Sequence, residues 1–214
     1  MTKINLKPFA RASIKDIQNQ DCKIETDKML IDTNVLYFCY YDRWSQLADI
    51  SKGVKDYQLR EYSKFFKKLL DLKKSLFVHR ISLFEFAKRI EIAELQILYC
   101  EKNKITNFNE KDFSLKELRR TYYSENNKIK TNLSAYLHSI QKTFNLLNVD
   151  KKIDLFLDDF LSDWKDSISG AGDAVMVSEA KQAGIHSILS DDSDFVSFKD
   201  IELYTANYLA INCQ

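Results

Sequence analysis

Five acidic residues lie at positions from which folding could bring their carboxylates together in one site: Asp32, Glu85, Asp173, Asp192 and Asp194. Two like charges about 4 Å apart repel by about 4 kcal/mol at an effective dielectric constant of about 20, so a shared pocket would raise their pKa values and destabilise the fold. A divalent cation offsets that repulsion, and ligand sets made only of carboxylates suit Mg²⁺ or Mn²⁺ rather than zinc. Such a metal orients water, lowers its pKa and neutralises a phosphate. The five acids therefore predict a metal-dependent site that handles phosphate or phosphodiester groups.

Short apolar runs and longer amphipathic segments alternate along the chain and must position these acids. Strands are expected at 28–31, 76–78, 185–189 and 201–204, and helices at 56–74, 82–100, 153–164 and 171–183. A long helical stretch is expected at 115–147, with a break near 126–127. The alternation predicts a helix-rich α/β protein, a three-layer α/β/α arrangement with a short central parallel sheet. Ligands bind at the carboxyl ends of the strands in such sheets, so acids that are far apart in sequence can converge there.

The composition and the charge pattern exclude several classes of protein. Hydrophobic residues make up 45% of the chain, which excludes a disordered protein. An all-β sandwich or barrel needs many turn residues, but the 214 residues include only 4 Gly and 1 Pro. The net charge of +1 hides a basic region at 52–80, with nine Lys or Arg against three acids, and an acidic region at 150–200, with five Lys against twelve acids. We expect the basic region to face an anion and the acidic region to hold a cation.

The chain is expected to divide into an N-terminal extension, residues 1–27, and a single domain, residues 28–214, that carries a helical insertion at about 89–164. Within the extension, Ser13 is expected to cap a short helix that ends at Gln20. The N-terminus has no apolar signal region, and no run approaches the roughly 20 apolar residues of a membrane span. The four cysteines are far apart and are expected to be free thiols. These features predict a cytoplasmic protein without a membrane anchor.

Four sequence motifs together resemble those of PIN-domain nucleases of the VapC-like type. They are LIDTNV at 30–35, SLFE at 82–85, GDA at 172–174 and SDDSDF at 190–195. Their order and their expected strand context match over about residues 28–204. The chain departs from the family pattern at Asp191, where Asn is usual, and in the helical insertion, which is longer than compact toxin relatives have.

The resemblance implies that the protein cleaves single-stranded RNA with a water molecule that Mg²⁺ or Mn²⁺ activates, leaving a 5′-phosphate. By position it implies four metal ligands, direct or through water, and one further or outer acid: Asp32, Glu85, Asp173 and Asp192, with Asp194. Asn34 and Ser190 are implied as polar supports. Many relatives are toxins of toxin–antitoxin pairs, so the resemblance also implies an antitoxin protein and a homodimer as partners.

Simpler structural roles are open for the same residues. Asp32 and Asp173 could merely cap helices, and Glu85 could form a capping box with Ser82. The aromatic residues of 37–44 are expected to pack in the core, with stacking on RNA bases as the alternative.

Two other classes of function also stay open. The segment 172–184 superficially resembles the late acidic motif of HAD-type phosphatases, but their chemistry needs an acid two residues after the nucleophilic Asp, and Asn34 stands there after Asp32. A non-catalytic PIN-like scaffold that binds RNA or protein is the third class. Its usual mark is the loss of acids, and none is lost here. Nothing in the sequence separates RNA from DNA as the substrate.

Overall fold

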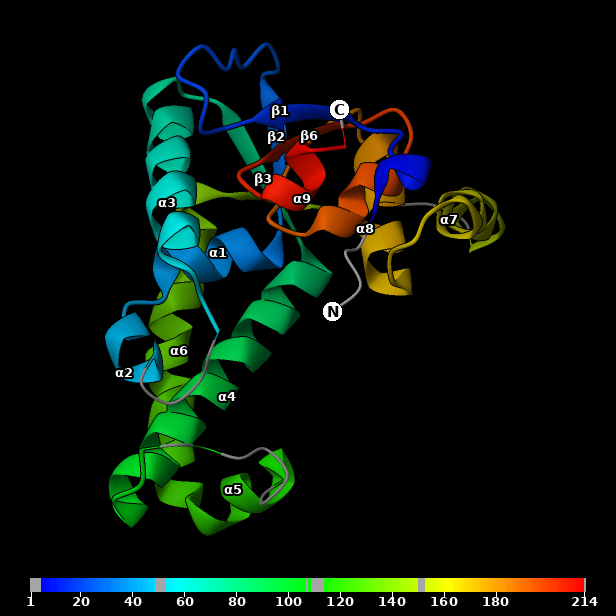
Figure 1. Cartoon of the computed structure of the whole chain (residues 1–214). Helices are drawn as coiled ribbons and strands as arrows, with labels where there is room; N and C mark the ends of the chain where they lie inside the picture. Colours follow the sequence, from blue (N-terminus) through cyan, green and yellow to red (C-terminus); the bar gives the residue numbers. More distant parts are fainter. Residues whose placement is uncertain (1–4, 49–52, 107, 109–113, 150–152, 214) are drawn as a thin grey trace.

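A parallel β-sheet lies at the centre of the molecule (Figure 1). The computed structural model describes residues 5–48, 53–106, 108, 114–149 and 153–213. Within these ranges the strands are β1 (Ser13–Asp16), β2 (Lys28–Ile31), β3 (Ser75–His79), β4 (Asn145–Leu147), β5 (Ser187–Leu189) and β6 (Glu202–Thr205). Their order in the sheet is β1-β6-β5-β2-β3-β4, and every pairing between them is parallel.

Helices connect the strands and cover the sheet. Their bounds are α1 (Thr33–Tyr40), α2 (Trp44–Ala48), α3 (Asp56–Asp71), α4 (Arg80–Asn103), α5 (Leu115–Thr121), α6 (Tyr123–Thr143), α7 (Ile153–Asp166), α8 (Ala171–Gln182) and α9 (Tyr208–Ile211), with short 3-10 helices η1 (Lys7–Phe9) and η2 (Ser193–Ser197). Since parallel strands need crossover connections, this alternation of strand and helix is what an all-parallel sheet requires.

The alternation of side chains along β2 divides the core into two. Met29 and Ile31 belong to a buried cluster with residues of α1, α3, α4 and α6. Leu30, between them, belongs to a second cluster with residues of α8, η2 and α9. Successive side chains of a strand point to opposite faces, so both faces of the sheet are apolar and both are covered by helices. The predicted α/β class, with three layers and a central parallel sheet, is confirmed.

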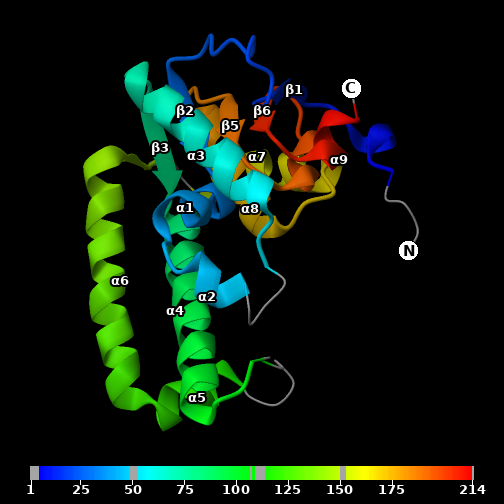
Figure 2. The ribbon, with the colours of Figure 1, turned by 60° about the vertical axis from the view of Figure 1, so that its left-hand side comes forward.

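The helices α4 and α6 run side by side as a long hairpin that projects from the sheet, with α5 at its far end (Figures 1 and 2). Midway along α4, Glu91 is buried and accepts two hydrogen bonds from the guanidinium of Arg119 on α5. Arg119 and its hydrogen bonds lower the pKa of Glu91. The insertion expected at 89–164 is therefore continuous with the core, because it begins inside α4 and returns through β4 to the sheet beside β3.

Three local predictions are wrong. Ser13 caps no helix: Ser13–Asp16 form the edge strand β1, which pairs with β6 and buries Ile14. Ser82 does not begin α4, because the cap is His79, whose Nδ1 accepts a hydrogen bond from the Ile81 backbone N–H at 3.1 Å. The helical stretch expected over 115–147, with a break near 126–127, is instead interrupted at Tyr122 and ends at Thr143, after which the chain enters β4.

None of the helices in the described ranges combines the length and the apolar character needed to cross a lipid bilayer.

Candidate active site

Asp32 lies where β2 passes into α1, at the carboxyl edge of the sheet. Its Oδ1 accepts a hydrogen bond from the Thr33 backbone N–H at 2.6 Å, which caps α1. Its Oδ2 accepts hydrogen bonds from Asn34 Nδ2 at 2.6 Å and Ser190 Oγ at 2.7 Å. The residue is only 5% exposed, and this burial raises its pKa to about 6 although the hydrogen bonds from Ser190 and Thr33 lower it. Asp32 thus caps a helix and is also held in one orientation beside other acids.

Asn34 and Ser190 join the loop after β2 to the loop after β5. The Oδ1 of Asn34 accepts a hydrogen bond from the Asp191 backbone N–H at 3.0 Å. The Oγ of Ser190, which is fully buried, accepts one from the Asp192 backbone N–H at 3.0 Å. Because both side chains also donate to Asp32, they fix the spacing between the two acidic loops.

Glu85 lies in the second turn of α4 and is exposed to solvent. Its Oε2 accepts a hydrogen bond from Thr33 Oγ1 at 2.9 Å, which turns the carboxylate toward the start of α1. The capping box with Ser82 is wrong, since the Oγ of Ser82 donates instead to Met176 Sδ at 3.2 Å. Glu85 is therefore free of any capping role.

Asp173 lies in the first turn of α8. Its pKa is raised to about 7, first by burial and then by the negative charges of Asp32, Asp192 and Glu85, in that order. A carboxyl group responds in this way only where other carboxylates are near enough to repel its ionised form. Four acids from four separate segments of the chain therefore share one electrostatic neighbourhood.

Asp192 and Asp194 sit at the start of η2, directly after β5. The Oδ1 of Asp192 caps this short helix by accepting a hydrogen bond from the Asp194 backbone N–H at 2.9 Å. Burial, and then the charge of Asp192, raise the pKa of Asp194. Asp194 thus interacts with the group through Asp192.

The carboxylate of Asp191 points away from these acids. It accepts hydrogen bonds from three side chains of α3, namely those of Tyr57, Gln58 and Tyr62. Its backbone C=O accepts one from Asn207 Nδ2 at 2.6 Å. Burial raises its pKa while the hydrogen bonds from α3 lower it. Asp191 therefore ties the loop after β5 to α3 and to the cap of α9, which explains an acid at this position without a metal.

A groove of about 650 Å³ adjoins the acids, between α1, α4 and the loop after β5. It is lined by two aromatic rings, four side-chain amides and a guanidinium: Tyr37, Phe38, Asn34, Gln58, Gln96, Asn207 and Arg89. The positive charge of Arg89, which lines the groove, lowers the pKa of Asp32. The rings of the segment 37–44 otherwise pack against one another and in the core, as expected.

The acids fit a hard divalent cation in their chemistry and their charge. Among the described residues, no three side chains of Asp, Glu, His or Cys are already drawn together as a metal cage. The set is nevertheless made of carboxylates alone, and the charges of Asp32, Asp192 and Glu85 add to burial in raising the pKa of Asp173. A bound Mg²⁺ or Mn²⁺ would relieve the repulsion between these charges.

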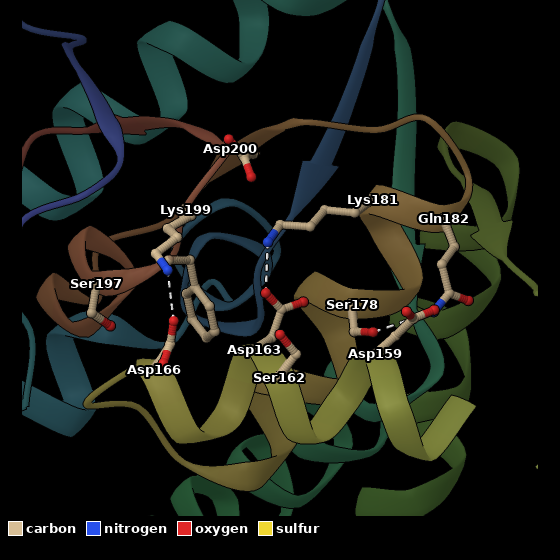
Figure 3. Close-up of a pocket in the computed structure, with 11 residues that line it drawn as sticks. Asp159, Ser162, Asp163, Asp166, Ser178, Lys181, Gln182, Ser197, Lys199 and Asp200 are labelled. Atoms are coloured by element: carbon tan, nitrogen blue, oxygen red, sulfur yellow. Dashed lines mark hydrogen bonds and ion pairs between the residues drawn. The ribbon is translucent and has the colours of Figure 1, made fainter. Parts of the chain in front are cut away.

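A second cavity, of about 380 Å³, lies between α7, α8 and the turn before β6 (Figure 3). Its two lysines form ion pairs within it, Lys181 with Asp163 at 2.6 Å and Lys199 with Asp166 at 2.6 Å. None of the predicted site residues lines it. Both lysines of this cavity are thus engaged by aspartates, and two further aspartates, Asp159 and Asp200, also line it.

Two residues of the site were not predicted from the sequence. Thr33 donates a hydrogen bond to Glu85, and the positive charge of Arg89 acts on Asp32. The sequence contained a signal for each of these two residues. Thr33 belongs to the first motif, and Arg89 follows Glu85 by four residues, which places both on one face of a helix.

The sequence matches no described protein family, and it shows no significant similarity to a curated protein. One solved structure, the "Crystal structure of VapBC2 from Rickettsia felis bound to a DNA fragment from their promoter", aligns with a TM-score of 0.49 and 10% sequence identity. The alignment covers 83% of this chain and 98% of that chain. At this level of similarity, the match does not establish the activity, the substrate or a partner of this chain.

Proposed function

We propose that this chain is a PIN-type nuclease that hydrolyses phosphodiester bonds of single-stranded RNA with the help of Mg²⁺ or Mn²⁺. The observation that carries the proposal is the gathering of Asp32, Glu85, Asp173 and Asp192 at one edge of a parallel sheet, beside an open groove. Such a set of oxygen ligands suits metal-assisted phosphoryl chemistry. The four sequence motifs that resemble PIN-domain nucleases contain these same acids.

Each residue of the site has a separate role in the proposed reaction. When bound, the metal supplies an activated water molecule and neutralises charge on the phosphate. Asp32, Glu85, Asp173 and Asp192 would hold it, with Asp194 on the outer side. The hydrogen bonds from Asn34 and Ser190 orient Asp32 and favour its carboxylate form, which opposes the effect of burial on its pKa.

The resemblance to PIN-domain toxins extends the proposal to two protein partners. An antitoxin would bind this chain and block cleavage, and a second copy of the chain would form a homodimer. Co-expression with a small neighbouring reading frame tests the first, and light scattering of the purified chain tests the second.

The test of the proposed function is cleavage of a mixed RNA pool with Mn²⁺, followed by sequencing of the products. The variants Asp32→Asn and Asp173→Asn should abolish cleavage while keeping the fold. Asp200→Asn is the matched control, because this residue is exposed in the turn before β6 and its φ of 59° suits Asn well. It should cleave as the parent does.

Several results would overturn the proposal. Equal cleavage by the parent and both acid variants would remove the acids from the chemistry. Hydrolysis of small phosphomonoesters with RNA left intact would assign a phosphatase. RNA binding without turnover in Mg²⁺ or Mn²⁺ would assign a scaffold. Cleavage of single-stranded DNA in preference to RNA would correct the substrate.

A further inference from the structure

Phe84 is the most exposed of the large hydrophobic side chains in the described structure, at 74% of its full accessible surface. It comes one residue before Glu85 on α4, whose carboxylate accepts a hydrogen bond from Thr33 at the start of α1. Its neighbours Leu83 and Phe86 pack in the core, so they supply the apolar contacts of this turn. The phenyl ring of Phe84 therefore contributes little to folding, and it presents a flat apolar face to solvent one residue away from a candidate site residue.

Two cations lie one turn further along the same exposed side of the helix. Lys88 and Arg89 are exposed, and neither forms an ion pair with another residue of the described ranges. Residues four apart lie on the same face of a helix, so Lys88 follows Phe84 and Arg89 follows Glu85. The helix thus carries a ring, an acid and two positive charges within two turns.

The positions of these side chains around the axis of α4 indicate the direction in which a bound chain would cross the helix. With 3.6 residues per turn, Phe84 lies about 100° to one side of Glu85, and Arg89 lies about 40° to the other side. Arg89 also lines the groove. A single-stranded RNA that passes over Glu85 would leave the groove at Arg89 and meet the ring of Phe84 on the other side of Glu85.

We propose that Phe84 is a stacking platform for a base of the single-stranded RNA, and that Lys88 and Arg89 bind the phosphates next to it. This inference rests on the proposed function and adds residues that recognise the substrate. An aromatic ring stacks on any base, and nearby cations bind the backbone, which is how proteins hold single strands without reading their sequence. The positive charges also suit a polyanion and not another basic surface.

The experiment measures binding of a fluorescently labelled single-stranded RNA to the full chain by anisotropy, with EDTA to prevent cleavage and at low ionic strength. Phe84→Ala should weaken binding about 5- to 150-fold, the range for losing one stacked base. Phe84→Tyr keeps the ring and should bind within about twofold of the parent. Tyr123→Ala is the matched control, because Tyr123 is 69% exposed but lies at the far end of the hairpin.

The salt dependence of RNA binding tests the roles of Lys88 and Arg89. Lys88→Ala and Arg89→Ala should each reduce the slope of log K against log salt concentration by about 0.7, the value for one phosphate contact of a single strand. Lys142→Ala, which removes an exposed charge at the sheet end of α6, should leave the slope unchanged.

The outcomes separate this inference from the proposed function. It is overturned if the parent does not bind the RNA, if Phe84→Ala binds as tightly as the parent, or if only the binding of a protein partner is lost. If Phe84→Ala weakens binding but the parent never cleaves RNA, this inference stands and the nuclease proposal fails. If the parent cleaves RNA and Phe84→Ala has an unchanged KM, the nuclease proposal stands and this inference fails.

Discussion

Replacing Asp173 by Asn should stabilise the metal-free protein at neutral pH. The ordinary pKa of an aspartate is 3.8, and in the folded chain burial and three neighbouring acids raise it to about 7. The folded state therefore binds the proton of Asp173 more tightly than the unfolded state. The contribution of Asp173 to the stability of the parent is fully present below about pH 4 and is lost as the pH rises through about 7.

The magnitude follows from the size of the shift. About three pKa units correspond to about 4 kcal/mol, and screening by solvent at this partly exposed site reduces that to about 2 kcal/mol. Asn cannot ionise and has nearly the same shape. Between pH 4 and pH 8, the free energy of unfolding of Asp173→Asn should therefore rise by about 2 kcal/mol relative to the parent, or by about 4 to 8 °C in Tm.

The assay is urea unfolding of both proteins at pH 4 and pH 8, each with EDTA and with Mn²⁺. The difference between the two proteins isolates Asp173, because groups distant from it contribute equally to both. Added Mn²⁺ should stabilise the parent at pH 8 and should stabilise the variant less, since binding to the folded state alone raises stability. The reasoning is refuted if the difference between variant and parent does not change with pH, because the four acids would then not share a site.

Three further predictions concern residues that hold the elements around the acids in place. The free energy of unfolding, measured by heat or urea, tests each of them. Asp191→Ala should cost about 2 to 3 kcal/mol, because three donors on α3 lose their acceptor, whereas Asp191→Asn should cost less. His79→Ala should cost about 1 to 3 kcal/mol, because it removes the cap of α4 and the partner of buried Glu179 at 2.9 Å; an unchanged stability would contradict both roles. Burial lowers the pKa of His79, so its contribution is present above about pH 6.5 and is lost as the pH falls, a loss that His79→Ala should remove. Gly184→Ala should cost about 1 kcal/mol, because φ is 68° at this position, and Gly184→Asn should cost less.

The alternation of apolar runs and amphipathic segments was enough to predict the α/β class, because the periods of strand and helix are local properties of the sequence. The same pattern predicted β2 at 28–31, since three consecutive apolar residues can be buried only between two layers of helices. The edge strands β1 and β4 were missed. They are short, and only their pairing with β6 and β3 makes them strands.

That acids stand at the ends of the strands was evident from the sequence alone, because capping, turn formation and metal binding all favour the same residue types there. The sequence could not decide which acids meet. Asp191 and Asp192 are adjacent and chemically alike, yet one binds the side chains of α3 and the other faces Asp32 and Asp173. Only the packing of α3 against the sheet separates them, because a choice between two neighbouring carboxylates depends on donors more than 120 residues away.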